Sequence, residues 1–303
     1  MNYLESSVVA VKKILRKKRL EALRKKIVSY CKEHCNAEFQ EIGEYLGSNA
    51  LECYNYHYTK RYKKLNINVY YDNELNLFYV VHKNKKMYMK KGWTASQVRD
   101  YYRFIRIEQD ELSPHLYFTK ELQDKRFRKV VDLGAAEGNF TLEIIDSCDK
   151  AYIFECDDGW IEALHATFAP WKEKVAIVPV VVSNVTRDNM MTLDYYFKDD
   201  LENIDLIKID VEGSEVQVLQ GAEKILTQNK QVRMFICAYH YQNEESEIRT
   251  YLSGWHLKHR NGYIVMIDDK RQKKPYLRRG VLEASRANPE NRVKSPPHCT
   301  AVV

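Results

Sequence analysis

Six polar side chains follow apolar runs of the sequence, each at or just beyond the end of a predicted strand. Carboxylates and an imidazole can accept hydrogen bonds from ligand hydroxyls, exchange protons with a reacting group or bind a divalent ion. In an open parallel sheet, ligands bind beyond the carboxyl ends of the strands. We therefore expect one shared ligand site for these residues, which are Asp132, Glu155, Ser183, Asp210, Glu212 and His240.

The stretch "KVVDLGAAEGNF", residues 129–140, predicts a strand, a glycine turn and a helix. Val130 and Val131 suit a buried strand, and Gly134 and Gly138 free the backbone for a sharp turn. Such a turn points backbone N–H groups and a helix N-terminus at a bound ligand. A nicotinamide or flavin fingerprint has the pattern G-x-G-x-x-G, and the wider glycine spacing here argues against it. A glycine turn with only a structural role is the alternative.

The next stretch, residues 151–158, has an apolar run that ends in the acid Glu155, which lies 21 residues after Gly134. An acid about 20 residues beyond such a turn, at the tip of the neighbouring parallel strand, accepts hydrogen bonds from ribose hydroxyls. The alternative is a solvated acid at a strand end. Taken together with the turn, the spacing favours a nucleoside site.

Further apolar runs continue the alternation of strands and helices. Residues 174–184 and 231–240 predict strands, and residues 203–226 predict a strand followed by a helix. Alternating stretches at 256–268 and 275–285 predict an antiparallel pair at the sheet edge. This order predicts an α/β fold with a parallel sheet and helices on both faces.

The segments "VVDLGAAEGNFTLEI", "IFECD" and "IDLIKIDVEGSEVQVLQGAEKIL" resemble the FkbM-type family of class I S-adenosylmethionine (SAM)-dependent methyltransferases. The resemblance covers residues 105–285 and includes the upstream segment "EQDELSPHLYF". It implies a Rossmann-like sheet, SAM as the cofactor and methyl transfer to a hydroxyl, commonly on a sugar or a polyketide-like natural product. This chain has Cys156 where the family often has proline, and Asn184 where aspartate is frequent. These departures leave the ribose contact of Glu155 intact.

Cofactor binding is predicted for residues of the glycine turn and of three strand ends. They are Asp132, Gly134, Ala135, Glu137, Gly138, Asn139, Glu155, Cys156, Ser183 and Asp210.

Catalysis is predicted for Asp210, Glu212 and His240, which follow the fourth and fifth strands. His240 is the predicted base because an imidazole titrates near neutrality, and Asp210 is expected to orient it or the acceptor. No bound metal is predicted. The alternatives are a divalent ion held by these three residues, which would polarise the hydroxyl, and a purely structural Asp210. Three residues of "SPHLY" are expected to fold over the acceptor from the preceding segment, and they are Ser113, His115 and Tyr117.

Four parts of the chain are expected. Residues 1–60 form a basic helical arm, 61–120 a small antiparallel β cap, 121–285 the methyltransferase domain and 286–303 a disordered tail.

The arm carries the net charge of the protein. Residues 1–30 hold nine basic and two acidic side chains, giving +7, and the other 273 residues hold 39 basic and 40 acidic, giving −1. An interrupted apolar stripe accompanies this charge, and residues 8–30 are expected to lie on an anionic membrane surface or an acidic protein. The alternative is a helix that packs its stripe on the catalytic domain and leaves its charges solvated. The stripe consists of Val8, Val11, Leu15, Leu23 and Ile27.

The leading hypothesis is an O-methyltransferase acting on a sugar, a glycan or a similar small acceptor. The alternatives are a non-catalytic SAM-binding scaffold subunit and an RNA methyltransferase. The positive charge lies on one helix rather than among aromatic residues around the pocket, and "SPPH" at 295–298 does not follow the fourth strand, which argues against nucleic acid. No apolar run has the length of a membrane span, and seven cysteines form no CxxC pair. A cytoplasmic protein, peripheral at the inner membrane face, is expected.

Overall fold

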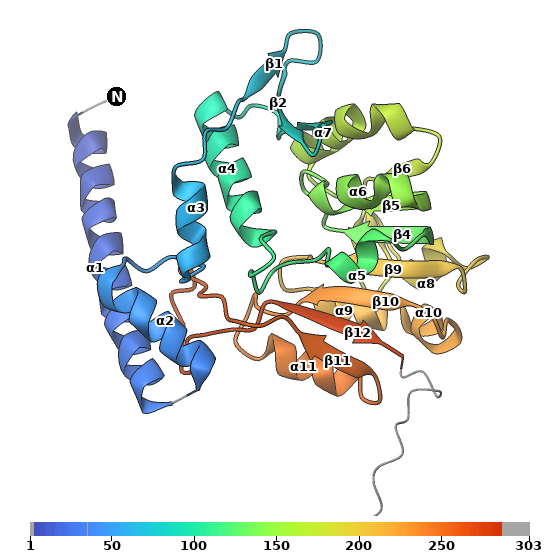
Figure 1. The fold of residues 1–303 in the computed structure, drawn as a ribbon. Coiled ribbons are helices and arrows are strands. Elements are labelled where there is room, and N and C mark those ends of the chain that lie inside the picture. Colours follow the sequence, from blue (N-terminus) through green and yellow to red (C-terminus); the bar gives the residue numbers. More distant parts are fainter. Residues whose placement is uncertain (1–2, 35, 287–303) are drawn as a thin grey trace, which may run out of the picture.

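A seven-stranded sheet organises the computed structural model, which describes residues 3–34 and 36–286, with side chains from residue 12 onward. The strand order is β11-β12-β10-β9-β4-β5-β6 (Figure 1). Strands β10, β9, β4, β5 and β6 are parallel, and β12 is antiparallel to both of its neighbours. This sheet confirms the predicted Rossmann-like class I methyltransferase fold. The strands are β4 (Phe127–Leu133), β5 (Cys148–Phe154), β6 (Val175–Val178), β9 (Ile204–Ile209), β10 (Arg233–Cys237), β11 (His256–His259) and β12 (Val281–Ser285).

Three of these strands are shorter than the sequence pattern predicts. β6 ends at Val178 because Pro179 has no N–H to donate to a neighbouring strand. The following valines form a separate two-stranded ribbon, in which β7 (Val181–Val182) pairs with β8 (Met190–Met191). The antiparallel edge pair is present as β11 and β12, but residues 260–280 between them belong to neither strand.

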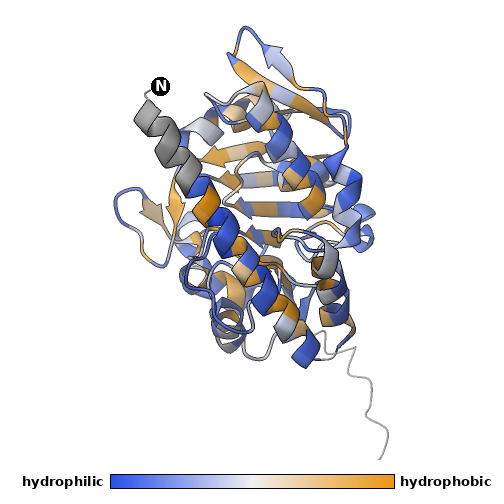
Figure 2. Cartoon of the chain, turned by 90° about the vertical axis from the view of Figure 1, so that its left-hand side faces the viewer, coloured by the Kyte–Doolittle hydropathy of each residue, from blue (hydrophilic) through white to orange (hydrophobic). Residues whose placement is uncertain are grey.

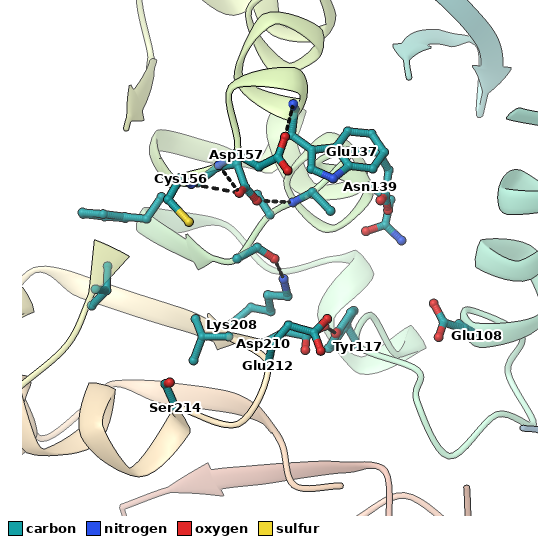
Figure 3. Close-up of a pocket in the computed structure, with 18 of the residues that line it drawn as sticks. Glu108, Tyr117, Glu137, Asn139, Cys156, Asp157, Lys208, Asp210, Glu212 and Ser214 are labelled. Carbon is teal, nitrogen blue, oxygen red and sulfur yellow. Dashed lines mark hydrogen bonds between the residues drawn. The ribbon is translucent and has the colours of Figure 1, made fainter. Parts of the chain in front are cut away.

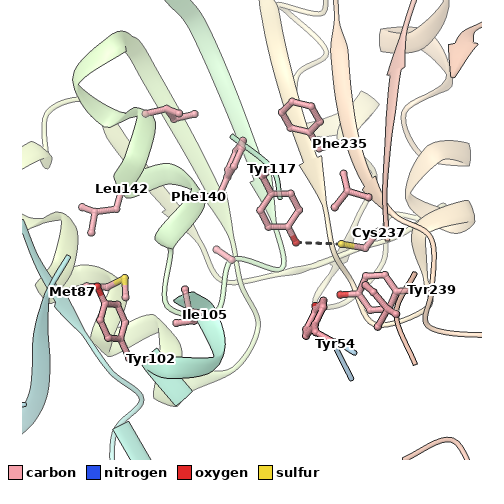
Figure 4. Packing of buried hydrophobic residues seen from close by; sticks show 14 of the residues in the cluster. Tyr54, Met87, Tyr102, Ile105, Tyr117, Phe140, Leu142, Phe235, Cys237 and Tyr239 are labelled. Carbon is pink, nitrogen blue, oxygen red and sulfur yellow. Dashed lines mark hydrogen bonds between the residues drawn. The ribbon is translucent and has the colours of Figure 1, made fainter. Parts of the chain in front are cut away.

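Helices cover both faces of the sheet, as predicted. Successive residues of β4 point to opposite faces, so Val130 joins one buried cluster and Val131 joins the other. The first cluster packs under α6 (Asn139–Ile144) and α7 (Asp158–Phe168) and contains the rings shown in Figure 4. The second cluster packs under α8 (Leu193–Tyr196), α9 (Glu215–Gln220), α10 (Glu223–Gln228) and α11 (Glu244–Tyr251).

The predicted antiparallel cap is a three-stranded meander, with β2 paired to both β1 and β3. It leads into α4, which begins at a capping box between Thr94 and Gln97. The elements before the sheet are α1 (Tyr3–Glu33), α2 (Ala37–Ser48), η1 (His57–Thr59), α3 (Lys60–Lys63), β1 (Tyr70–Asp72), β2 (Leu77–His82), β3 (Lys85–Tyr88), α4 (Ala95–Glu108) and α5 (Lys120–Gln123).

The basic helix α1 is present, and its apolar stripe divides between two faces. Leu23 and Ile27 are buried, whereas Leu15 is exposed. The side chains of Val8 and Val11 lie outside the described residues. So do residues 287–303, which contain nearly all of the predicted tail. Within the described ranges, no helix combines the length and the apolar character needed to span a bilayer.

The order of the strands switches between β4 and β9, which are neighbours in the sheet although β5 and β6 come between them in the sequence. β5 and β6 lie on one side of β4, and β10 lies beyond β9 on the other side. Such a switch point forms the ligand-binding crevice of open α/β sheets. Here the loop after β4 touches the loop after β9, because a Cβ added at Gly134 would lie 1.9 Å from the carbonyl oxygen of Asp210. Gly134 also has a φ of +68°, so both its backbone and its surroundings exclude a side chain.

Candidate active site

A cavity of about 520 Å³ lies at the carboxyl ends of β4, β5 and β9, and α4 closes it from the cap (Figure 3). Its volume is within the range of small-molecule sites. Ten of the residues predicted from the sequence line it, namely Gly134, Ala135, Glu137, Asn139, Glu155, Cys156, Asp210, Glu212, His115 and Tyr117.

Five other residues predicted from the sequence do not line the cavity, although some of them hold its walls in place. Gly138 allows α7 to approach, because a Cβ there would lie 2.8 Å from Leu164 and Phe168. The Ser113 hydroxyl accepts a hydrogen bond from the His115 backbone N–H at 3.1 Å. The set outside the wall is Asp132, Gly138, Ser183, His240 and Ser113.

The Glu155 carboxylate is held between the glycine turn and its own loop. One oxygen accepts a hydrogen bond from the Ala136 N–H at 2.9 Å. The other accepts from the N–H groups of Cys156 at 2.8 Å and Asp157 at 2.9 Å. Two carboxylate oxygens offer about four acceptor positions, so capacity remains for a ligand hydroxyl. This fixed carboxylate beside a glycine turn fits the ribose of a nucleoside cofactor.

Lys208 lies beneath the turn, and the sequence reasoning missed it. Its side chain is 4% exposed, and Nζ lies 3.2 Å from the carboxylate of Asp132. Nζ also donates to the carbonyl oxygens of Leu133 and Gly134. Burial lowers the pKa of Lys208, but Asp132 and Asp210 outweigh that effect and raise it. The available signal was a lysine inside the apolar strand "IDLIKI", since lysine is almost never fully buried without a partner.

His240 lies behind Asp210, surrounded by carboxylates. Its Nε2 is 3.2 Å from Asp210, and its Nδ1 is 3.2 Å from Glu215 and 3.4 Å from Glu244. Glu215 and Glu244 are completely buried at the starts of α9 and α11. Glu212 lies farther away, at 3.8 Å, with a side chain that is 91% exposed.

These carboxylates hold the His240 ring in its charged form. Burial alone lowers its pKa, but the interactions with Asp210, Glu215 and Glu244 raise it to about 12. An imidazolium has no lone pair with which to take a proton at neutral pH. The predicted role of His240 as the base therefore conflicts with its surroundings, because the sequence did not reveal the two buried glutamates. The same imidazolium, together with Lys208, outweighs burial and keeps the pKa of Asp210 well below its usual range.

His115 and Tyr117 reach the cavity from the segment before β4. Figure 4 shows the Tyr117 ring pointing to Cys237 at the end of β10. The Tyr117 hydroxyl donates to Asp210 at 2.8 Å and lies 3.2 Å from the sulfur of Cys237. His115 Nε2 is 2.7 Å from the Tyr239 hydroxyl. Burial lowers the pKa of His115 to about 4, so its ring is neutral.

Helix α4 supplies a wall that the sequence reasoning did not anticipate. Tyr101, Phe104 and Glu108 follow one another at helical spacing and all line the cavity. Glu108 accepts a hydrogen bond from the Tyr54 hydroxyl at 2.9 Å. Burial, reinforced by nearby carboxylates, raises the pKa of Glu108 to about 8. Tyr101 stacks obliquely on Trp160 of α7, with ring centroids 5.6 Å apart.

Among the residues that the structure describes, two groups of side chains could hold a metal ion. The donor atoms of His115, Asp210 and Cys237 lie within 4.8 Å of one another, as do those of Asp210, Glu215 and His240. The second group overlaps the predicted trio, with Glu215 in place of Glu212. A metal there would have to displace the proton of the His240 imidazolium, because metals bind the neutral ring.

The sheet order, the glycine turn and the acid at the tip of β5 together define a class I methyltransferase. The sequence matches the model of the methyltransferase FkbM domain over residues 42–265. The chain therefore belongs to the FkbM methyltransferase family, and its fold implies SAM as the methyl donor. A comparison with curated proteins gave no significant match.

Solved structures with a similar fold include other methyltransferases. The methyltransferase FkbM from Methylobacillus flagellatus KT has 19% identity and a TM-score of 0.46, over 60% of this chain and 50% of its own length. This chain thus spans half of the Methylobacillus protein. An rRNA methylase from Streptococcus thermophilus has 16% identity and a TM-score of 0.37, over 54% of this chain and 89% of its own length.

Replacing Glu155 by Ala should weaken SAM binding tens-fold or more. The change removes the acceptor of a charge-assisted hydrogen bond from the ribose, worth about 1.5–3 kcal/mol. Isothermal titration calorimetry measures the effect, and Asp158→Ala, which removes an exposed acid three residues away, should bind SAM normally. Unchanged SAM affinity in Glu155→Ala would refute the ribose assignment.

Replacing His240 by Gln should reveal a stabilising charge that fades with rising pH. A raised folded-state pKa gives stability that is complete below the unfolded value of 6.5 and is lost as pH rises towards the folded value. The advantage of the wild type over His240→Gln should therefore shrink from about pH 7 to about pH 9, by up to about 1.4 kcal/mol per unit. Urea unfolding at several pH values measures it. An advantage that stays constant or grows would contradict the charged ring.

Proposed function

We propose that the protein transfers the methyl group of SAM to a hydroxyl of a neutral acceptor, such as a sugar, a glycan or a similar small natural product. The observation that carries this proposal is the lining of the cavity outside the glycine turn. It combines aromatic rings with a carboxylate that hydroxyl groups can reach. The rings are those of Tyr101, Phe104, Trp160 and Tyr239, and the carboxylate is Glu108.

The charges of the cavity support a neutral acceptor over a nucleic acid. Glu108, Glu137, Asp210 and Glu212 all line the wall. Lys208 is the only lysine or arginine in that lining, and its charge is already paired with Asp132. Phosphate groups bind where lysine and arginine gather. A phosphate backbone would instead meet several carboxylates here, which disfavours the RNA methyltransferase alternative.

The residues present fit the cofactor that the fold implies. Glu155 would hold the ribose, and the backbone of the turn from Gly134 to Gly138 would hold the rest of the nucleoside side. When bound, SAM supplies an electrophilic methyl group. The intact cradle and the carboxylates facing it favour an enzyme over a non-catalytic scaffold subunit.

Glu108 is one carboxylate of the lining that is suited to take the proton of the acceptor hydroxyl. The oxygen that takes the methyl group must lose its proton, and a base works best when its pKa lies near the working pH. The pKa of Glu108 is about 8, whereas that of Asp210 is held well below its usual range. Figure 3 shows Glu108 arriving from α4 on the side of the cavity away from the strand ends. Asp210, fixed by Tyr117 and His240, is left to orient the acceptor.

Labelled SAM tests this proposal directly. The protein is incubated with methyl-labelled SAM and fractions of neutral glycans, small metabolites and RNA. We expect label to enter a neutral hydroxylated molecule as a methyl ether that resists mild alkali. Glu108→Gln should bind SAM normally but turn over about 100-fold more slowly. Asp158→Ala serves as the active control.

The outcomes separate the alternatives. Label in material that ribonuclease digests would point to an RNA methyltransferase. SAM binding without label in any fraction would favour the scaffold subunit. Full turnover by Glu108→Gln would remove Glu108 from the proton transfer.

A further inference from the structure

The outer face of α1 exposes two large apolar side chains next to each other. Ile14 is 55% exposed and Leu15 is 60% exposed. Lys18 lies one turn farther along the same face. Figure 2 shows that α1 runs diagonally across the side of the molecule turned towards the viewer. These side chains project away from the domain, in contrast to the buried Leu23 and Ile27.

Exposed lysines precede and follow this apolar pair in α1. The structure gives six exposed lysines between residues 12 and 26, and within the described ranges none of them forms an ion pair. The arginines of this stretch behave differently. Arg16 pairs with Asp268 at 3.1 Å, and Arg24 pairs with Glu21 at 2.8 Å. The lysines are Lys12, Lys13, Lys17, Lys18, Lys25 and Lys26.

The inner face fixes α1 to the rest of the protein. Ile27 is completely buried with α2 in the large cluster. Arg19 donates to the carbonyl of Ile267 at 2.8 Å, and Arg24 donates to the carbonyl of Leu46. The helix is thus held in one orientation, with its basic outer face turned to solvent. This part of the structure agrees with the packed alternative considered from the sequence, except that Ile14 and Leu15 are left without a partner in the described chain.

We propose that this outer face binds an anionic membrane surface. A helix lying at such a surface can place exposed apolar side chains at the boundary of headgroups and acyl chains, while its lysines meet the lipid phosphates. Ile14 and Leu15, with exposed lysines before and after them in the helix, fit that arrangement. A single-stranded nucleic acid would instead need aromatic side chains on which its bases can stack. The exposed residues from 12 to 29 include no aromatic side chain. The remainder of the chain has almost no net charge, so attraction would orient the protein through α1.

Vesicle flotation with the full chain tests the membrane proposal independently of the acceptor. The probes are vesicles of phosphatidylcholine alone and of equimolar phosphatidylcholine and phosphatidylglycerol. We expect the protein to float with the anionic vesicles only. The variant K12Q/K13Q/K17Q/K18Q should bind at least about 100-fold more weakly, since each lysine near the surface contributes about fivefold. I14S/L15S should bind the anionic vesicles at least about tenfold more weakly.

The matched control removes the same charge elsewhere. K172Q/K198Q/K224Q/K230Q changes four exposed lysines of the methyltransferase domain and should float like the wild type. SAM calorimetry on every variant verifies that the fold is intact. Equal flotation of the wild type and K12Q/K13Q/K17Q/K18Q, or no flotation with anionic vesicles, would overturn the proposal. If I14S/L15S bound the vesicles as tightly as the wild type, the contact would be purely electrostatic, which would contradict the insertion of Ile14 and Leu15 into the membrane surface. Retention on RNA without flotation would identify a nucleic-acid surface instead.

Discussion

The buried ion pair between Lys208 and Asp132 is the interaction on which the site depends. It joins β9 to β4 at the switch point of the sheet, and Lys208 also donates to the carbonyls of Leu133 and Gly134. A buried charge is tolerated only when it is paired and hydrogen-bonded. Lys208 therefore fixes the end of strand β4, where the glycine turn begins. The close approach of Gly134 to Asp210 extends this constraint to the loop after β9.

The arrangement of charges divides the carboxylates of the cavity into two kinds. Asp210 lies between Lys208 and the His240 imidazolium, so it stays ionised and fixed. Glu108 enters from α4, and its protein contact is the Tyr54 hydroxyl rather than a cation. Burial then raises its pKa to about 8. Similar groups thus acquire different chemistry from their surroundings, which supports an orienting role for one and proton transfer for the other.

Local sequence patterns were enough to predict much of the fold and part of the site. The turn at Gly134 and the acid at Glu155 are signalled by nearby sequence, and both line the cavity. The state of His240 was not predictable in this way, because Glu215 and Glu244 come from separate helices and only the tertiary fold buries them beside the ring. Glu108 was missed because its position depends on how the cap packs on the sheet.

A double-mutant cycle on Asp132→Asn and Lys208→Met tests the central role of the ion pair most directly. Urea unfolding measures stability, and SAM calorimetry measures the site. Each single change should cost about 3–5 kcal/mol, because it leaves an unpaired buried group, and should abolish SAM binding. The double variant should cost less than the sum by about 1–3 kcal/mol. Additive losses, or a Lys208→Met protein with wild-type stability and SAM affinity, would contradict the account.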